Sequence, residues 1–226
     1  MISVCLAAYN GEKHIGAQIA SILASSRVAE LLVSDDGSTD CTRAAVAAVA
    51  DPRVRLLVGP GRGVVRNFEF LLGQATGKYL FLADQDDVWL ERKVDAMMQA
   101  LDKADLVVSD CAIVDDRLHV VAPSFFAARG SGPGLVKNFL CNSFLGCCMA
   151  FRRELLDYVL PFPATIPMHD WWIGLMASRR GRVRFLHEVL VLYRRHEANA
   201  TYAVVSEASL LQQLRWRLHM LGALLT

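Results

Sequence analysis

The N-terminal half of the sequence alternates short apolar runs with segments whose apolar residues recur every three or four positions. We predict strands at 2–10, 31–34, 53–59 and 78–84, and helices at 12–26, 38–50, 64–76 and 90–103. Ser38 or Thr39 is expected to cap the second helix. Strands and helices at this spacing form parallel βαβ units with right-handed crossovers. About the first 110 residues are therefore restricted to an open α/β sheet, which binds ligands outside the carboxyl ends of its strands.

The pattern changes from about residue 110. We expect consecutive strands within 105–116, a flexible loop at 124–134, a strand at 144–151 that leads to a helix near Arg153, a helix within 166–181, and two short strands at 182–188 and 189–195. No linker-like stretch separates the two halves of the chain. The sequence therefore predicts one α/β domain at 1–203, followed by an amphipathic helix at 204–226.

Charge and cysteine content narrow the class of protein. Lys plus Arg number 24 and Asp plus Glu 23, so the chain is not a polycation that binds nucleic acid. The six cysteines form no CxxC pair and no zinc-type spacing with histidine, which is typical of small buried thiols. The first strand begins at Ile2, and no apolar run approaches the ~20 residues of a membrane span. We expect a soluble or peripheral cytoplasmic protein without a signal peptide.

Three carboxylates follow the fourth predicted strand in the stretch FLADQDDVW, residues 81–89. Asp84 and Asp86 straddle Gln85, and residues two apart in an extended segment point the same way, so both carboxylates can face one ion. Oxygen ligands favour Mg²⁺ or Mn²⁺, and a magnesium shell is usually completed by water and substrate phosphates. The alternative is a solvated turn in which Asp87 caps the next helix.

A second acidic pair, Asp35 and Asp36, follows the second strand in SDDGSTD, residues 34–40. Acidic residues at this place in dinucleotide folds accept hydrogen bonds from ribose hydroxyls. The alternative is an ordinary Asp-Gly turn before a helix cap. Asn10 falls at the end of the first strand, so three strand ends carry polar groups. Together they favour a ligand site at this edge of the sheet.

Four N-terminal motifs occur in the order and spacing of one enzyme family: AAYNGEKHI, SDDGSTD, GVVRNFE and DQDDVW. With them, the sequence resembles the family 2 glycosyltransferases of the GT-A fold. IPMHDWW and LYRRHEAN look like the branch that transfers rhamnose onto bacterial surface polysaccharides. The resemblance implies a mixed, mainly parallel central sheet flanked by helices. It also implies a nucleotide-binding half at 1–110 and an acceptor-binding half at 111–203.

The resemblance implies roles for individual residues. The nucleotide would be bordered by Ala8, Tyr9, Asn10, Asp36, Arg66 and Asp84. The metal ion and diphosphate would be held by Asp84, Asp86 and His196. Asp170 would be the general base that deprotonates the acceptor hydroxyl, with His169, Trp171 and Trp172 around the acceptor. The alternative for Arg66 is a pair with a surface acid, which is common for arginines at strand ends. The alternative for His196 is a surface residue, because a lone histidine is more often that than a ligand.

Asp170 also suits a base on physical grounds. An inverting transfer needs a carboxylate on the far side of the sugar from the departing diphosphate, and Asp170 is distant in sequence from Asp84 and Asp86. Trp171 and Trp172 would partly desolvate Asp170 and raise its pKa, and they could stack on sugar rings. The alternative is that Asp170 caps the helix that starts at Trp171, with both tryptophans in the core.

The C-terminal stretch SLLQQLRWRLHMLGALLT predicts a basic amphipathic helix. Leu210, Leu214, Leu218 and Leu221 lie on one stripe of this helix. Such a helix can lie on an anionic membrane, where lipid-linked acceptors would be found. The commoner alternative is packing of the stripe on the domain or on a second subunit, in a homodimer.

We therefore predict a metal-dependent inverting glycosyltransferase. By resemblance the sugar is L-rhamnose from dTDP-L-rhamnose, with a UDP-sugar as the other donor, and the acceptor is a bacterial surface polysaccharide or a lipid-linked glycan. A haloacid-dehalogenase-like phosphatase using Asp84 and Asp86 also fits FLADQDDV, although that class places the motif on its first strand. A third class is a scaffold that binds a nucleotide sugar without turnover.

Overall fold

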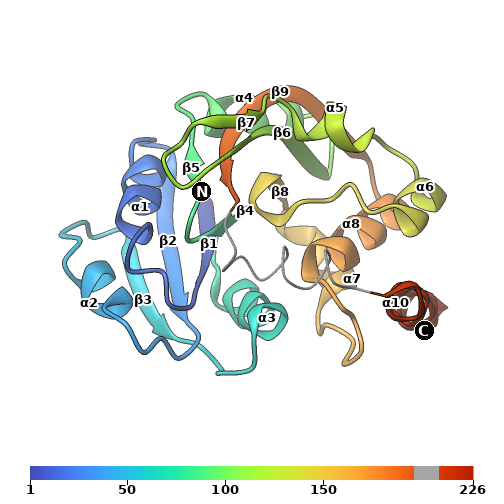
Figure 1. The fold of residues 1–226 in the computed structure, drawn as a ribbon, viewed down its shortest axis with the longest axis horizontal. Coiled ribbons are helices and arrows are strands. Elements are labelled where there is room, and N and C mark those ends of the chain that lie inside the picture. The colour runs from blue at the N-terminus through green and yellow to red at the C-terminus, as the bar shows by residue number, and fades with distance from the viewer. Residues whose placement is uncertain (196–208, 226) are drawn as a thin grey trace.

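The fold is built on one mixed sheet with helices packed around it (Figure 1). The computed structural model describes residues 1–195 and 209–225. Within them, eight strands follow the order β3-β2-β1-β4-β8-β6-β9-β5, and β7 pairs with β6. The predicted fold class, a mixed and mainly parallel α/β sheet in a single domain, is confirmed.

The N-terminal half forms the parallel part of the sheet. Its strands are β1 (Ile2–Ala8), β2 (Val28–Asp35), β3 (Val54–Val58) and β4 (Tyr79–Asp84). Its helices are α1 (Ile15–Leu23), α2 (Thr42–Ala47), α3 (Val64–Gln74) and α4 (Lys93–Leu101). In the register of the sheet, Ala8 pairs with Asp35 and Ala7 with Asp84. The acidic ends of β2 and β4 therefore lie on either side of the end of β1.

The second half adds antiparallel pairings. The remaining strands are β5 (Val88–Trp89), which precedes α4 in the chain, and then β6 (Leu106–Val114), β7 (Val120–Ala122), β8 (Met149–Arg152) and β9 (Val183–Arg194). Strand β8 runs antiparallel to β4 and β6, while β9 runs parallel to β6 and antiparallel to β5. The boundary predicted at residue 110 falls inside β6, so the sheet is continuous across the two halves.

Several predicted elements differ from the structure. The consecutive strands expected within 105–116 are one strand, β6, and the two short strands at 182–195 are one strand, β9. The register between β6 and β9 shifts on both sides of Asp110. This irregularity lies within one continuous pair of strands, where the sequence had predicted separate strands. The predicted cap of α2 was also wrong: α2 begins at Thr42, and the Ser38 hydroxyl accepts the Asn10 backbone N–H at 2.8 Å.

The remaining helices cover the second half of the sheet. They are α5 (Phe125–Arg129), α6 (Leu135–Leu140), α7 (Leu156–Val159), α8 (His169–Arg180) and α10 (Leu210–Leu225). Short 3₁₀ turns lie at Gly146–Cys148 and Arg153–Leu155. The loop predicted at 124–134 contains α5, because the Ser124 hydroxyl caps its start and Gly130 ends it at a φ of 65°. None of the described helices is long and apolar enough to cross a membrane.

Helix α8 packs closely against the loop before Cys147. A Cβ atom on Gly174 would lie 2.2 Å from the Phe144 ring, so only glycine permits this approach. The close approach fixes the position of α8, and α8 carries Asp170.

The buried thiols expected from the sequence occur at Cys5, Cys111, Cys147 and Cys148, whereas Cys41 and Cys141 are exposed.

We expect Gly174→Ala to destabilise the fold by about 1 to 3 kcal/mol, because the added methyl group overpacks the contact with Phe144. The matched control is Gly73→Ala in α3, where a Cβ atom meets nothing within 4 Å. That change should stabilise the chain by roughly 0.5 to 1 kcal/mol through helix propensity. Urea unfolding of both variants measures the difference, and equal effects would show that Phe144 yields freely.

Candidate active site

A pocket of about 770 Å³ opens at the carboxyl ends of β1, β2 and β4. The predicted site residues among its lining are Ala8, Tyr9, Asp36, Asp84, Asp86, His169 and Asp170. The segment that begins α8 supplies the last two, and Gly146 and Leu145 lie beside them. The structure thus brings residues from both halves of the chain around one cavity.

Gln85 ties the end of β1 to the acidic loop. The Tyr9 backbone N–H donates to Gln85 Oε1 at 2.8 Å, and Gln85 Nε2 donates to the Tyr9 carbonyl at 2.8 Å. A Cβ atom on Gly11 would lie 2.2 Å from Gln85 Oε1, so a larger residue here would displace the Gln85 side chain. Sequence reasoning treated Gln85 only as a spacer between two carboxylates. In the structure it fixes the distance between the end of β1 and the acidic loop.

Asp36 closes the loop that forms another wall of the pocket. Its Oδ1 and Oδ2 accept the backbone N–H groups of Gly61 and Gly63, each at 2.7 Å. Because both oxygens hold this loop, Asp36 shapes the cavity as well as facing it. Asn10 is used in a similar way: its Oδ1 accepts the Thr39 N–H at 2.8 Å, and Asn10 is not among the residues that line the pocket.

The acidic loop 84–87 carries carboxylates that are hard to ionise together. Burial, then the charges of Asp86 and Asp170, raises the pKa of Asp84 to about 8. Burial and the charges of Asp86 and Asp84 raise the pKa of Asp87 well above its ordinary value. Asp87 Oδ2 is buried and has no hydrogen-bond partner among the described residues. Without a cation, the folded chain relieves the repulsion among these carboxylates by protonation. A cation at this loop would relieve the same repulsion and leave the carboxylates ionised.

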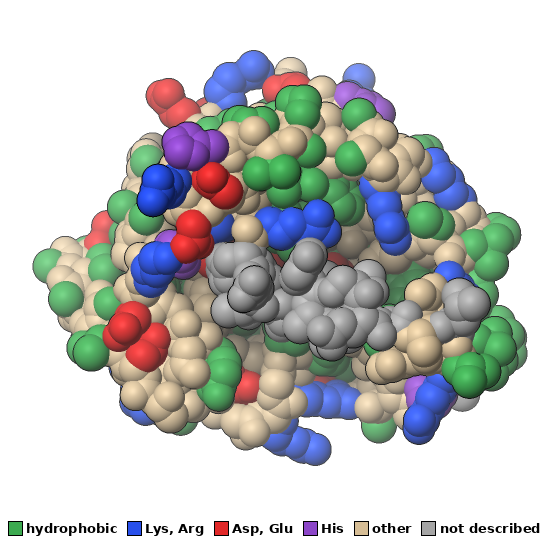
Figure 2. Space-filling model, in the orientation of Figure 1, with side chains coloured by type: hydrophobic (Ala, Val, Ile, Leu, Met, Phe, Trp, Pro, Cys, Tyr) green, Lys and Arg blue, Asp and Glu red, His purple; other side chains and the backbone are tan. Residues whose placement is uncertain are grey.

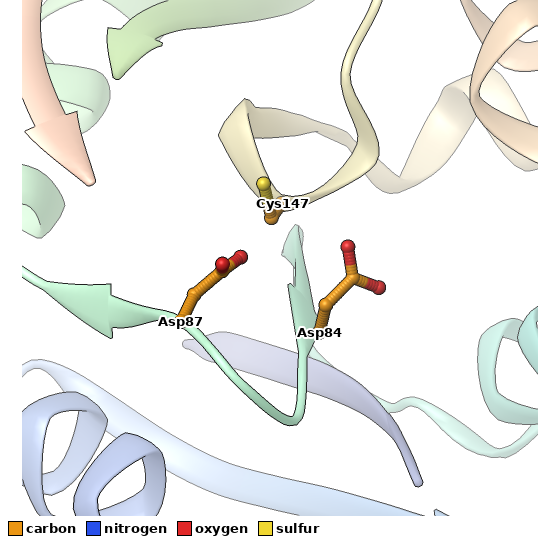
Figure 3. A group of neighbouring side chains, drawn as sticks. All are labelled: Asp84, Asp87 and Cys147. Carbon is orange, nitrogen blue, oxygen red and sulfur yellow. The ribbon is translucent and has the colours of Figure 1, made fainter. Parts of the chain in front are cut away.

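The donor set that the structure brings together differs from the predicted pair. Within the described residues, Asp84, Asp87 and Cys147 can each place one ligand atom within 4.8 Å of the others (Figure 3). Burial raises the pKa of the Cys147 thiol well above its usual value, which favours a neutral thiol rather than a thiolate ligand. Asp86 is buried and lines the pocket together with Asp84. The carboxylates thus provide the hard oxygen ligands of this region.

Two basic residues lie behind the acidic loop. Lys93 is fully buried: its Nζ donates to the Cys147 carbonyl at 2.5 Å and lies 4.2 Å from the centre of the Trp89 ring. The Arg194 Nε donates to the Asp86 carbonyl at 2.8 Å, and the Arg194 backbone N–H donates to Asp87 Oδ1 at 3.0 Å. The Lys93 charge lowers the pKa of Asp84, against the effects that raise it. These contacts hold the loop in shape from the core side.

Asp170 lies in the first turn of α8 and faces the pocket. Its Oδ1 accepts the Trp171 N–H at 2.6 Å and its Oδ2 accepts the Gly146 N–H at 3.2 Å. Burial raises the pKa of Asp170 to about 6, while these N–H groups act in the opposite direction. The carboxylate is therefore oriented by the backbone and is ionised at neutral pH, as a general base requires.

The aromatic neighbours of Asp170 have different positions. Trp171 and Trp172 are buried and absent from the pocket lining, and their indole N–H groups donate to the Asn138 carbonyl at 2.8 Å and the Val159 carbonyl at 3.0 Å. This corrects the expectation that they stack on sugar rings, because both rings belong to the core. His169 does line the pocket, and its ring stacks on Phe68 with centroids 4.0 Å apart.

The His169 ring presents an unused polar atom. Its Nε2 is buried without a hydrogen-bond partner in the part of the chain that the structure describes. Burial lowers the pKa of His169 to about 3, so the ring is neutral at physiological pH. A neutral ring with a free nitrogen can form one hydrogen bond with a bound hydroxyl.

Arg66 lies outside the pocket, and His196 falls outside the described residues. Arg66 is not among the residues that line the pocket: its guanidinium pairs with Glu69 and donates to the carbonyls of Phe162 at 3.0 Å and Pro163 at 3.1 Å. It therefore joins α3 to the loop before α8. Its pair with Glu69 matches the alternative in which such an arginine pairs with an acid. His196, the predicted third metal ligand, lies outside the described residues.

The raised pKa of Asp84 predicts that stability falls with rising pH in the absence of metal. The carboxyl has a pKa of about 8 in the folded chain and about 4 in the unfolded chain. Folding therefore takes up a proton, and the stabilising contribution, complete below about pH 4, is lost as the pH rises through about 8. We expect the thermal midpoint with a chelator present to fall between about pH 6 and about pH 8, and Asp84→Asn to flatten that slope. An unchanged slope in this variant would contradict the assignment.

Known proteins are similar to this chain over most of its length. The model of the family "Glycosyl transferase family 2" matches residues 3–160. A curated relative from Escherichia coli, the UDP-Glc:alpha-D-GlcNAc-diphosphoundecaprenol beta-1,3-glucosyltransferase WfgD, is 32% identical over 181 residues. The match covers 77% of this chain and 68% of that protein.

Solved structures share the fold. The complex of S. aureus TarS 1-349 with UDP-GlcNAc matches at a TM-score of 0.69 and 18% identity, over 92% of this chain and 61% of that one. Glucosyl-3-phosphoglycerate synthase from Mycobacterium tuberculosis, in complex with Mn²⁺, UDP and phosphoglyceric acid, matches at 0.66 and 24% identity, over 96% of this chain and 78% of that one. The family match spans both acidic strand ends and most of the described sheet. The chain belongs to glycosyl transferase family 2.

Proposed function

We propose that this chain is a metal-dependent inverting glycosyltransferase, which transfers a sugar from a nucleoside diphosphate to a hydroxyl group of a glycan. One observation carries the proposal: a single pocket in a family 2 chain places Asp36, Asp84 and Asp86 at strand ends and Asp170 on the facing helix. The first three residues provide a site for a nucleotide and a cation. The fourth provides a base.

The nucleotide half of the donor would lie against Ala8, Tyr9 and Asp36. These residues line the pocket at the ends of β1 and β2, where α/β sheets bind nucleotides. Tyr9 is 57% exposed, so its ring is available to pack on a base. Two solved structures that match the fold were crystallised with UDP-GlcNAc and with UDP. A uridine or thymidine donor is consistent with this site.

A divalent cation fits the acidic loop. Asp84 and Asp86 line the pocket, and the charge of Asp86 raises the pKa of Asp84, so a cation would stabilise both ionised groups. Mg²⁺ or Mn²⁺ suits this oxygen donor set. When bound, such an ion supplies charge that stabilises a leaving diphosphate. The synthase from M. tuberculosis was crystallised with Mn²⁺.

Asp170 accepts the proton of the acceptor hydroxyl in this proposal. Its pKa of about 6 leaves the carboxylate ionised at neutral pH and more basic than an ordinary aspartate. The N–H groups of Trp171 and Gly146 hold the two oxygens in place before the acceptor binds. The backbone therefore orients the base, and the reaction does not have to pay for that ordering.

The acceptor and the donor sugar are proposed from the sequence and the relatives. The motifs around Asp170 favour L-rhamnose from dTDP-L-rhamnose, whereas the curated E. coli relative is named for transfer from UDP-Glc to a diphosphoundecaprenol-linked sugar. A bacterial polysaccharide or lipid-linked glycan acceptor agrees with both. His169 lines the pocket beside Asp170 and is the candidate for contact with the acceptor.

The other two predicted classes have less support. A phosphatase that uses Asp84 and Asp86 would not need the carboxylate of Asp170, which lines the same pocket from α8. Family membership also favours sugar transfer. A scaffold that only binds a nucleotide sugar has no need of a base oriented by two backbone N–H groups.

Calorimetry tests the donor site. We expect UDP or dTDP to bind to the purified chain with an affinity that rises at least about tenfold when Mn²⁺ or Mg²⁺ is added, because the cation links the diphosphate to the acidic loop. GDP serves as the competing nucleotide. Binding of all three with equal affinity, or without any effect of metal, would contradict the proposed site.

The base is tested by Asp170→Asn. We expect nucleotide affinity to stay within about twofold of wild type, while the transfer rate falls by roughly 10² to 10⁴, since only proton acceptance is lost. The matched control is Asp157→Asn at an exposed position of α7, which should leave both nucleotide affinity and transfer rate unchanged. Normal transfer by Asp170→Asn would remove Asp170 from the mechanism.

A further inference from the structure

One face of helix α10 is a row of exposed leucines. Leu211, Leu214, Leu218, Leu221 and Leu225 are between 44% and 80% exposed. Their spacing of three and four residues places them on one side of the helix, and we call them the leucine stripe. Met220 is buried on another face of α10, and Trp216 and Leu224 pack against the core. The helix therefore holds on to the domain without using the stripe.

Helix α6 extends this apolar surface. Val136 is 71% exposed and Leu140 is 57% exposed. The two helices touch, because Arg217 Nη2 on α10 donates to the Leu140 carbonyl at 2.8 Å. In Figure 1 they lie at the same edge of the molecule, and Figure 2 shows hydrophobic side chains gathered at that edge. We call the leucine stripe together with Leu135, Val136 and Leu140 the α6–α10 face.

The two helices of the α6–α10 face carry charge of one sign. The sequence has no Asp or Glu from residue 117 to 153, or from 209 to 225, although acids and bases are nearly balanced over the whole chain. Lys137 lies on α6 and Arg215 and Arg217 on α10. Positively charged groups thus border a surface of exposed aliphatic side chains.

We propose that the α6–α10 face binds the surface of an anionic lipid bilayer, with the leucine stripe inserted among the headgroups. Apolar area and basic charge are the two contributions that bind an interfacial helix to such a surface. A second copy of the chain fits less well. Pairing two stripes would bring the Arg215 and Arg217 side chains of both copies together, with no acid on the helix to pair with them.

The position of the face relates it to the pocket. A groove of about 540 Å³ lies between α10 and the loop before α8, and Leu211, Arg215 and His219 are among its lining. Pro167 lines both this groove and the pocket that contains Asp170. An acceptor anchored in the bilayer would thus reach Asp170 from the side of the groove. This last step rests on the proposed function, whereas binding to lipid does not.

Vesicle flotation with the 226-residue chain tests the proposal. We expect the protein to float with vesicles of phosphatidylcholine and phosphatidylglycerol, and at least about fivefold less with phosphatidylcholine alone, because each basic residue near the surface contributes about that factor. High salt should reduce binding to the anionic vesicles. Failure to float with anionic vesicles would overturn the proposal, whether or not nucleotide binding is intact.

Matched variants test the stripe itself. Leu214→Glu/Leu218→Glu should weaken vesicle binding at least about tenfold, because it withdraws two inserted side chains and adds negative charge. Val121→Glu changes an exposed aliphatic residue outside the face and should bind as wild type does. Thermal unfolding checks that each variant is folded. Equal binding by all three proteins would contradict the proposal, as would a wild-type dimer that the double variant converts to a monomer without any loss of lipid binding.

Discussion

Repulsion among carboxylates at one end of the sheet is the constraint on which the site depends. Asp84, Asp86 and Asp87 occupy one short loop, and Asp170 faces them from α8. The fold tolerates this concentration because Arg194 donates to the Asp86 carbonyl and to the Asp87 carboxylate, and because buried Lys93 lies behind the loop. The pKa of Asp84 nevertheless stays raised, so the built-in positive charge only partly offsets the repulsion. The remaining repulsion would be relieved by a cation on the pocket side, which is the basis of the proposed metal site.

The parallel half of the fold was predictable because its pattern is simple. Buried strands read as continuous apolar runs, and α1 and α3 repeat their apolar residues at helical spacing. The second half was harder. Its antiparallel pairings bring together segments far apart in the chain, and the irregularity between β6 and β9 made one strand read as two. Local periodicity does not contain the information that joins them.

The candidate site was predictable in part. Asp36, Asp84, Asp86 and Asp170 line one pocket, as their strand-end and helix-start positions suggested. Lys93 and Gln85 were missed, since a lysine in an amphipathic helix is normally exposed and a spacer residue carries no motif. The one available signal was the position of Lys93, four residues after Trp89 and the DQDDVW motif. Trp171 and Trp172 were placed at the acceptor because eight consecutive or nearly consecutive positions of α8 are buried, so its sequence has no apolar stripe that marks the core face.

The central claim is that the acidic loop binds a divalent cation together with a nucleoside diphosphate. Electron paramagnetic resonance of Mn²⁺ tests it directly, because the signal of the free ion falls when the ion binds. With UDP present, we expect wild type to remove Mn²⁺ from solution beyond what UDP alone removes, and Asp84→Asn/Asp86→Asn to lose that difference. An Mn²⁺ signal that wild type leaves unchanged, or that the double variant lowers equally, would contradict the account.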